Sequence, residues 1–291
     1  MSDGVLKTTG VRVYRSLVAP IGRRRLRKLV AEGLPHTLEE PVSFLLGDAR
    51  SVDVSARHAV GKIEALRRAF ASRSDIVTVV KPGFDSADAR RTAHAIAYES
   101  SVAEEWGTFL YLLARSVGAR HILELGSCAG ISGCYLAVTP ACERLVTVEG
   151  SPSLARIASE HLAAVSRTAR VVEGMFAEVL EVVLAALRPG IDLAYIDGQK
   201  DAAGIMPVIR RVVDHLQPGG VLVLDDIRWS RDLATLWAEL TSAGGFSFAL
   251  DLGRFGVCVR DAESALPRVA SLARYTGWLR RVHHREPGRS R

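Results

Sequence analysis

The sequence predicts an α/β fold with a mostly parallel sheet and a helical N-terminal extension. In the first third, apolar residues recur at helical spacing at positions 60, 63, 66 and 70, and residues 86–117 are rich in alanine and lack proline. From residue 120 onward, short apolar runs such as HILELG, RLVTVEG and VLVLDD alternate with stretches of helical composition such as PSLARIASEHLAAV. This alternation is typical of strands joined by crossover helices. Two final runs, FSFALDL and FGVCVRD, are joined by a short link containing Gly253, which predicts a terminal antiparallel hairpin.

We expect three segments along the chain. Residues 1–97 form a mainly helical extension, broken at KPGFDS (81–86), that covers a site or provides a homodimer surface. Residues 98–262 form the α/β domain, and residues 263–291 form a basic C-terminal tail. With 291 residues and 48% hydrophobic content, the chain is long enough to bury a sizeable core.

The composition argues against several classes of protein. No run of about 18 apolar residues is present that would span a bilayer, and the start, MSDGVLKTTG, lacks the apolar stretch of a secretory signal. We therefore expect a cytoplasmic protein with no transmembrane segment. The four cysteines show no C-x-x-C pairing, which argues against both disulfides and a zinc site.

The net charge of +6 is concentrated at the two ends of the chain. Residues 1–30 carry eight Lys/Arg against Asp3, and residues 268–291 carry seven Arg against Glu286, so the ends sum to +7 and +6 and the middle to −7. Basic ends are suited to contact an anionic membrane surface or nucleic acid. The plainer interpretation is a solvated surface that keeps the protein in solution.

Two strand ends carry a pattern typical of nucleotide-type ligands. In an open parallel sheet, ligands bind at the edge where the strands have their carboxyl ends. The first strand ends in ELGSCAG, where Gly126 and Gly130 permit a tight turn and a close approach of the backbone to a ligand. The second strand ends at Glu149, at a distance along the chain suited to a ribose-hydroxyl acceptor, although Glu149 would also serve as a helix cap. The full G-x-G-x-x-G is absent, which argues against NAD.

Three carboxylates follow two later strands. Asp197 ends the fourth strand and Asp225 and Asp226 end the fifth, so we expect them to converge at the same edge. Like charges placed so closely repel one another unless a cation lies among them, and an all-oxygen set suits Mg²⁺. The alternative is that Asp225 and Asp226 cap the turn after their strand and that Asp197 contacts only the neighbouring ligand.

The ordered set of motifs ILELGSCAGIS, VTVEGSP, YIDGQKD and PGGVLVLDDIRW resembles the class I S-adenosylmethionine-dependent methyltransferases, specifically the cation-dependent catechol and caffeoyl-CoA O-methyltransferase group. The resemblance covers about residues 98–260. It implies a Rossmann-like seven-stranded, mostly parallel sheet with helices on both faces.

The resemblance also implies roles for individual residues. It assigns S-adenosyl-L-methionine to the glycine turn, to the acidic strand end, to the segment SSVAEEWG upstream and to the residues after the third strand. The residues implied to bind the cofactor are Ser101, Val102, Glu124, Gly126, Ser132, Glu149, Gly150, Met175, Phe176 and Asp197. The metal ligands are implied to be Asp197, Asp225 and Asp226, where the family commonly has asparagine at the third position. Lys200 and Asp197 are implied to be catalytic, with Lys200 as general base.

The chain departs from this family near the acceptor. Gly198 stands where an aromatic residue or histidine often follows the first metal ligand, Ala203 replaces a common tyrosine, and Ile131 replaces another. These changes affect the side of the pocket where the acceptor binds. Trp106 and Trp229 are candidate walls of that pocket, although each is also typical of core or interface packing.

We therefore expect a Mg²⁺-assisted O-methyltransferase that acts on a small-molecule hydroxyl acceptor, such as a catechol or another vicinal diol. The cation and partial burial are expected to lower the pKa of Lys200 so that it takes the acceptor's proton. A nucleic-acid methyltransferase is an alternative favoured by the basic ends, but IDGQK lacks the Asn/Asp-Pro-Pro-aromatic signature of enzymes that grip a flipped base. A catalytically silent binding or scaffold protein is the second alternative, and the intact Asp197, Lys200 and Asp225 argue against it.

Overall fold

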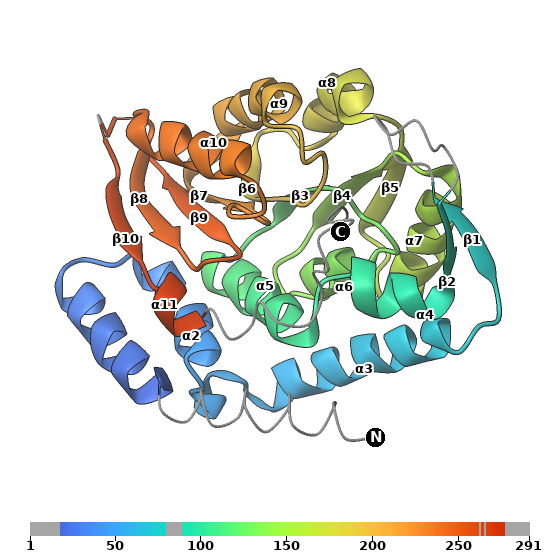
Figure 1. Cartoon of the computed structure of the whole chain (residues 1–291), viewed down its shortest axis with the longest axis horizontal. Coiled ribbons are helices and arrows are strands. Elements are labelled where there is room, and N and C mark those ends of the chain that lie inside the picture. The colour runs from blue at the N-terminus through green and yellow to red at the C-terminus, as the bar shows by residue number, and fades with distance from the viewer. Residues whose placement is uncertain (1–17, 80–88, 262, 265, 277–291) are drawn as a thin grey trace, which may run out of the picture.

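The computed structural model describes residues 18–79, 89–261, 263–264 and 266–276, and the α/β fold predicted from the sequence is confirmed. Its centre is an eight-stranded sheet with the order β10-β8-β9-β7-β6-β3-β4-β5 (Figure 1). The strands are β3 (His121–Leu125), β4 (Arg144–Glu149), β5 (Ala169–Glu173), β6 (Ile191–Ile196), β7 (Leu216–Leu224), β8 (Phe246–Asp251), β9 (Gly256–Arg260) and β10 (Arg268–Ser271). Strands β3 to β7 pair in parallel.

The end of the sheet differs from the prediction in one respect. The antiparallel hairpin of β8 and β9 is confirmed, and β9 also pairs antiparallel with β7. The predicted count of seven strands is wrong, because β10 adds an eighth strand parallel to β8. This strand lies inside the segment 263–291 that we expected to be a basic tail. It is a short edge strand in which only Ala270 is buried, so its sequence RVAS lacks the apolar alternation that predicts a strand.

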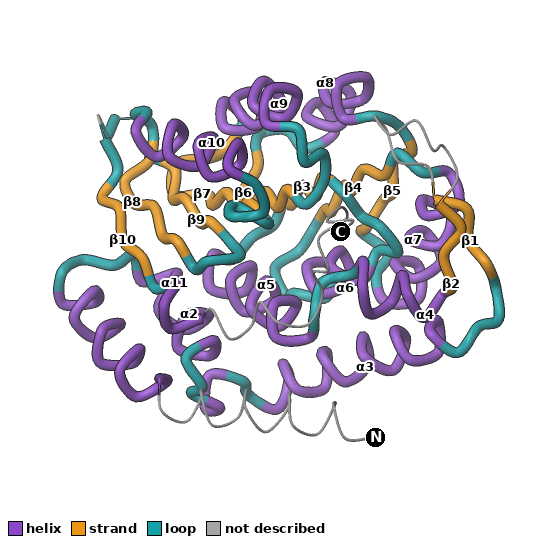
Figure 2. The backbone as a smooth tube through the Cα atoms, in the orientation of Figure 1, coloured by secondary structure: helices purple, strands orange, loops and turns teal. Residues whose placement is uncertain are grey.

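Helices cover both faces of the sheet (Figures 1 and 2). On one face lie α5 (Glu104–Val117), α6 (Ile131–Ala137) and α7 (Pro152–Val165), and on the other lie α8 (Phe176–Ala186), α9 (Ala202–Asp214) and α10 (Arg231–Ser242). Two large apolar cores result, because successive strand residues point to opposite faces: Ile122 packs into the first core and Leu123 into the second. This arrangement leaves the carboxyl ends of the parallel strands as a shared edge.

The N-terminal extension packs outside α5 and α6. Residues 18–31 are helical, and they are followed by α2 (His36–Leu45), the short 3₁₀ turn Ala49–Ser51 and α3 (Val54–Ala71). A small antiparallel hairpin of β1 (Ile76–Val79) and β2 (Ala89–Thr92) comes next. The helical pattern predicted for 86–117 is only partly confirmed: β2, α4 (Ala93–Ala95) and the π-helix Ile96–Ser100 precede α5, and a last short helix, α11 (Ala273–Thr276), follows β10. The predicted break at 81–86 lies outside the described residues.

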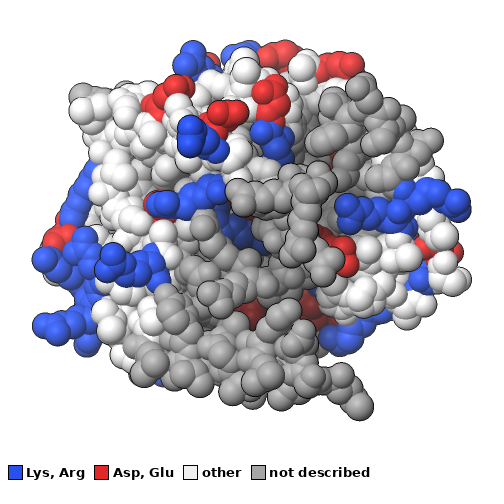
Figure 3. Space-filling view, in the orientation of Figure 1, with Lys and Arg blue, Asp and Glu red and all other residues white. Residues whose placement is uncertain are grey.

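Some of the basic residues expected at the N-terminus lie on a described helix. The helix at residues 18–31 carries five of them, Arg23, Arg24, Arg25, Arg27 and Lys28. In the space-filling view, Lys and Arg side chains lie at the left edge and also at the right edge (Figure 3). The other basic residues expected at the two ends fall largely outside the described residues. None of the helices in the described part of the chain is long and apolar enough to cross a membrane.

A buried arginine joins the extension to the α/β domain. The side chain of Arg67, on α3, is 2% exposed and pairs with Glu64 at 2.9 Å. Its guanidinium also donates to the backbone carbonyls of Ala97 and Val102, each at 2.7 Å, and Glu64 accepts a further hydrogen bond from Tyr135 on α6. Because a buried guanidinium needs partners for its N–H groups, Arg67 fixes the path of residues 97–102.

Replacing Arg67 should therefore destabilise the fold. Arg67→Met would leave the carbonyls of Ala97 and Val102 without this donor and the buried Glu64 carboxylate without its opposite charge, and we expect a loss of about 3–5 kcal/mol in the free energy of unfolding. Chemical denaturation measures this loss. The matched control is Arg68→Met, on the exposed face of the same helix, which should change the free energy by less than about 0.5 kcal/mol. Similar small effects for both variants would contradict the structural role of Arg67.

Candidate functional site

The candidate site lies at the carboxyl ends of the parallel strands, where β3 and β6 are neighbours. From β3 the chain proceeds to β4 and β5 on one side, and β6 then pairs on the other, so the strand order reverses here. The Asp197 N–H donates to the Leu125 carbonyl at 2.8 Å. Gly126 has a φ of +102°, and a Cβ built there would lie 2.0 Å from the Asp197 carbonyl oxygen. Only glycine therefore fits this turn.

Glu124 is a buried carboxylate beside the glycine turn. Its side chain is fully buried, and Oε2 accepts a hydrogen bond from the Thr147 hydroxyl at 2.5 Å. Oε1 has no hydrogen-bond partner among the described residues. Burial raises the pKa of Glu124 to about 7, and the neighbouring hydroxyls of Ser132 and Thr147 limit the rise. A buried carboxylate with an unpaired oxygen is suited to receive a cationic or N–H group from a ligand.

Glu149 lies at the end of β4, close to the glycine turn that joins β3 to α6. Its Oε2 accepts from the Cys128 N–H at 2.8 Å, and its Oε1 accepts from the Ser151 N–H at 2.9 Å. The second contact is at the N-cap of α7, so the capping role that we considered is present. Burial raises the pKa of Glu149, and these backbone N–H groups oppose the rise. Both contacts fix the carboxylate and leave each oxygen able to accept another hydrogen bond.

The remaining residues predicted to bind the cofactor lie around the same edge. Ser101 and Val102 are buried in the segment held by Arg67, and Ser132 is buried on the first turn of α6. Gly150 follows β4 directly. Met175 is the N-cap of α8, and Phe176 is buried at its start.

The structure explains two of the departures from the family pattern. A Cβ at Gly198 would lie 2.5 Å from Cζ of the Phe176 ring, so that ring takes the space of the missing side chain. Ile131 is buried in the core and is fully enclosed, as is Trp106, whose ring centroid is 4.4 Å from that of Phe255. Ala203 and Trp229 are exposed, with Trp229 at 40%. Of the two tryptophans, therefore, Trp106 is a core residue.

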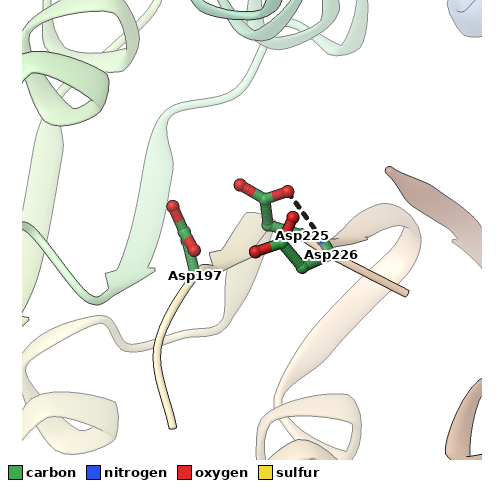
Figure 4. A group of neighbouring side chains, drawn as sticks. All are labelled: Asp197, Asp225 and Asp226. Carbon is green, nitrogen blue, oxygen red and sulfur yellow. Dashed lines mark hydrogen bonds between the residues drawn. The ribbon is translucent and has the colours of Figure 1, made fainter. Parts of the chain in front are cut away.

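The predicted convergence of three carboxylates is confirmed. Asp197 after β6 and Asp225 and Asp226 after β7 bring carboxylate oxygens within 4.8 Å of one another (Figure 4). Asp197 and Asp225 lie on both sides of the Tyr195 hydroxyl, which is 3.2 Å from Asp197 Oδ2 and 3.0 Å from Asp225 Oδ2. Burial, with the nearby Asp225 charge, raises the pKa of Asp197 to about 7.

Lys200 lies between two of these carboxylates. Its Nζ is 3.1 Å from Asp197 Oδ1 and 2.9 Å from Asp226 Oδ2, and its side chain is 36% exposed. Burial lowers the pKa of this ammonium, but Asp197 and Asp226 outweigh burial, so the pKa of Lys200 is raised. The predicted lowering of the Lys200 pKa depends on a cation beside it and stays a prediction, because the pKa is raised in this arrangement of side chains alone. Asp201, which follows Lys200 in the chain, caps α9 by accepting from the N–H groups of Ala203 and Gly204.

Arg254 is a site residue that the sequence reasoning missed. It lies in the link between β8 and β9, and the antiparallel register pairs Leu224 with Gly256, so this link lies beside the carboxyl end of β7. Its Nε and Nη2 donate to Asp225 Oδ1 and Oδ2, both at 2.7 Å. Burial opposes the ionisation of Asp225, yet this guanidinium lowers the pKa of the Asp225 carboxyl overall. The sequence signal was an arginine beside Gly253 in a hairpin next to the strand that ends in Asp225.

The carboxylate cluster does not fit a divalent cation in this arrangement. The number and type of oxygens suit Mg²⁺, but the cluster already contains two cationic side chains. Arg254 occupies both oxygens of Asp225, and Lys200 occupies one oxygen each of Asp197 and Asp226. Even with all three carboxylates ionised, three negative and two positive charges leave a net charge of only −1. A cation would have to displace Arg254 to reach Asp225.

Backbone strain collects at the same edge. Among the described residues, the non-glycine residues with positive φ are Cys128 at 49°, Gln199 at 36° and Asp226 at 56°. They follow β3, β6 and β7 in turn, which are the strands that carry the site. Such conformations cost of order 1–3 kcal/mol each and are concentrated at ligand sites. This strain supports a binding role for the edge.

Similarities to known proteins point to the same region. Residues 123–227 match a family model described as a methyltransferase domain. Catechol O-methyltransferases from Mycobacterium tuberculosis and Niastella koreensis are 31% and 28% identical over 130 residues, which is 44% of this chain and 57% and 58% of those proteins. The chain thus spans less than two thirds of the length of these curated relatives.

The fold has relatives among solved structures. An O-methyltransferase from Bacillus cereus, in complex with SAH, aligns with a TM-score of 0.51 at 19% identity, over 70% of this chain and 91% of that one. At this identity the likeness concerns the fold. It agrees with the mostly parallel sheet of this chain.

The burial of Glu124 predicts a pH-dependent contribution to stability. Its folded pKa of about 7 lies above the ordinary 4.5, so the wild type loses stability as the pH rises between these values. Glu124→Gln does not titrate, and its free energy of unfolding should exceed that of the wild type by on the order of 3 kcal/mol above pH 7, with little difference near pH 4.5. Urea denaturation at both pH values measures this. Glu173→Gln, at the exposed end of β5, is the control and should have little effect. A pH-independent effect of Glu124→Gln would contradict the burial argument.

Proposed function

We propose that this chain, whose residues 123–227 match a methyltransferase-domain model, is a class I S-adenosylmethionine-dependent methyltransferase that transfers a methyl group to a hydroxyl of a small molecule. The observation that carries the proposal is the buried, half-unpaired carboxylate of Glu124 beside the glycine turn and Glu149. The similarity of residues in this region to two catechol O-methyltransferases supports oxygen as the methyl acceptor.

We assign the cofactor to the edge that runs from β3 to β5. S-adenosylmethionine carries an α-ammonium group, and Glu124 Oε1 is a suitable acceptor for it. Glu149 is fixed by two backbone N–H groups and would accept from the ribose hydroxyls. Ser101 and Val102 would lie against the methionine part, with Met175 and Phe176 against the adenine. Gly126, Ser132 and Gly150 would allow the backbone to approach the ligand.

The reaction is a single displacement. The acceptor oxygen forms a bond to the methyl carbon as the carbon–sulfur bond breaks, the sulfonium becomes a neutral thioether, and the hydroxyl proton passes to solvent water. We propose that Lys200 contacts the reacting oxygen, because its ammonium lies between Asp197 and Asp226 at the end of β6. A protonated lysine stabilises the negative charge that develops on this oxygen. For Lys200 to act as the general base that we predicted, the acceptor would first have to separate it from one of the carboxylates, since both raise its pKa.

The acceptor class that we propose is a catechol-like molecule or another vicinal diol. The two catechol O-methyltransferase relatives support this class. The Mg²⁺ predicted from the sequence stays a prediction, and no step of the proposal depends on it, because Arg254 and Lys200 already pair with the three carboxylates. A homodimer and a role for the basic ends likewise stay predictions.

Cofactor binding is the first test. Glu149→Ala should weaken S-adenosylmethionine binding at least about tenfold, as expected for hydrogen bonds to a charged group. Isothermal calorimetry on the full chain measures this without a known acceptor. Glu173→Ala is the matched control, because Glu173 is the register neighbour of Glu149 on β5 and is exposed. Unchanged affinity in Glu149→Ala would remove this residue from the site, and no measurable binding by the wild type would refute the proposed function.

Substitutions of Lys200 separate its two candidate roles. Lys200→Met should lower kcat by about 10²–10⁴ on a catechol panel, with little effect on cofactor affinity. Lys200→Arg keeps the positive charge but cannot serve as a base at neutral pH. We expect the arginine variant to retain more activity than the methionine variant, because the neighbouring carboxylates favour the charged form. Equal losses in the two variants would instead assign Lys200 as the base.

A further inference from the structure

We propose that Arg254 takes the place of a divalent cation at the carboxylate cluster, so that the cluster is complete without a metal ion and Arg254 acts as a positioning residue for Asp225. This inference deepens the proposed function and rests on it only where methyl transfer is concerned. The cluster has the number and kind of oxygens that suit Mg²⁺, yet the chain itself provides the positive charge.

The first line of support is the saturation of Asp225. An ionised carboxylate offers about four lone-pair positions, and three N–H donors and the Tyr195 hydroxyl, which also lies near Asp197, surround this one. Arg254 donates to both oxygens at 2.7 Å, the Asp226 N–H donates to Oδ1 at 2.6 Å, and the Tyr195 hydroxyl lies 3.0 Å from Oδ2 (Figure 4 draws the Asp226 contact). A metal ion would have to displace at least one of them to bind Asp225.

The second line is that Arg254 is held in place. Its side chain is only 18% exposed, and its guanidinium carbon lies 5.7 Å from the centre of the Phe255 ring. Its own carbonyl accepts a hydrogen bond from the Ile227 N–H at 3.2 Å, which joins the hairpin link to the turn after β7. A bidentate guanidinium–carboxylate pair with both ends fixed by the backbone is directional and strong. The guanidinium is therefore part of the site's framework.

The third line is the charge of the remaining carboxylates. Lys200 bridges Asp197 and Asp226, and Arg254 also lies 3.9 Å from Asp226. Two cations serve three carboxylates, so the net charge of −1 gives a further dication far less attraction than three unpaired carboxylates would. The same pairing orients Asp225 toward Tyr195 and keeps the cluster from repelling itself.

A direct test measures Mn²⁺ binding to the full-length protein by electron paramagnetic resonance, with neither cofactor nor acceptor present. The wild type should bind Mn²⁺ no better at the cluster than an Asp225→Asn variant does. Arg254→Met removes the guanidinium and frees Asp225, and it should gain affinity for Mn²⁺ of at least about tenfold. Adding Asp225→Asn to Arg254→Met should remove the gain. Arg228→Met is the matched control, because Arg228 pairs with Asp251 outside the cluster, and it should not gain affinity.

The outcomes decide the inference independently of the proposed function. Wild-type Mn²⁺ binding that Asp225→Asn abolishes would overturn it, as would an Arg254→Met protein that folds by circular dichroism but gains no affinity. If Arg254→Met does not fold, two measurements still test the inference. One is the comparison of Mn²⁺ binding by the wild type and by Asp225→Asn. The other is Arg254→Lys, which keeps the positive charge and should not gain affinity for Mn²⁺. Full methyl transfer in excess chelator would support the inference, and complete loss that Mn²⁺ restores would refute it. Failure to bind S-adenosylmethionine would refute the proposed function alone, since the Mn²⁺ measurement needs no cofactor.

Discussion

The site depends on one constraint, which is that a carboxylate buried at the end of a core strand must have its charge compensated. Asp225 has a fully buried side chain, and burying an isolated carboxylate is unfavourable by far more than a protein's net stability. The chain meets this constraint with Arg254, from a hairpin link that the antiparallel pairing of β9 with β7 brings to the same edge. Because Asp225 is satisfied in this way, Lys200 is left to bridge Asp197 and Asp226.

A second buried arginine restrains the edge proposed to bind the cofactor. Arg67, from the N-terminal extension, is buried and ties the carbonyls of Ala97 and Val102 to α3. The extension is thus joined to the domain through the segment proposed to contact the methionine part of the cofactor. A buried arginine loses favourable interaction energy if any one of its fixed acceptors moves away. Both arginines therefore restrict the geometry of the edge. The strained turns after β3, β6 and β7 lie at the same edge, and such backbone conformations persist only where the surrounding structure keeps them in place.

Much of the fold followed from the sequence, because it depends on local patterns. Alternating strands and helices, the terminal hairpin and the convergence of the three aspartates depend on periodicity and on parallel strands sharing an edge, and the structure confirms them. Strand β10 was missed because an edge strand with one buried residue has no distinctive pattern. The raised pKa of Lys200 and the role of Arg254 were missed for a different reason. Both depend on side chains that meet across long stretches of chain, Lys200 with Asp226 over 26 residues and Arg254 with Asp225 over 29, and spacing along the sequence does not contain that information.

The central claim is that the chain provides its own cation at the carboxylate cluster while retaining a cofactor site at the neighbouring strand ends. A crystal structure of the full chain grown with S-adenosylhomocysteine and Mn²⁺, with anomalous data collected for manganese, tests it most directly. We expect the cofactor product against Glu124 and Glu149, the Arg254–Asp225 pair intact, and no anomalous peak among the aspartates. A manganese peak bound by Asp197, Asp225 and Asp226, with Arg254 turned away, would contradict the account.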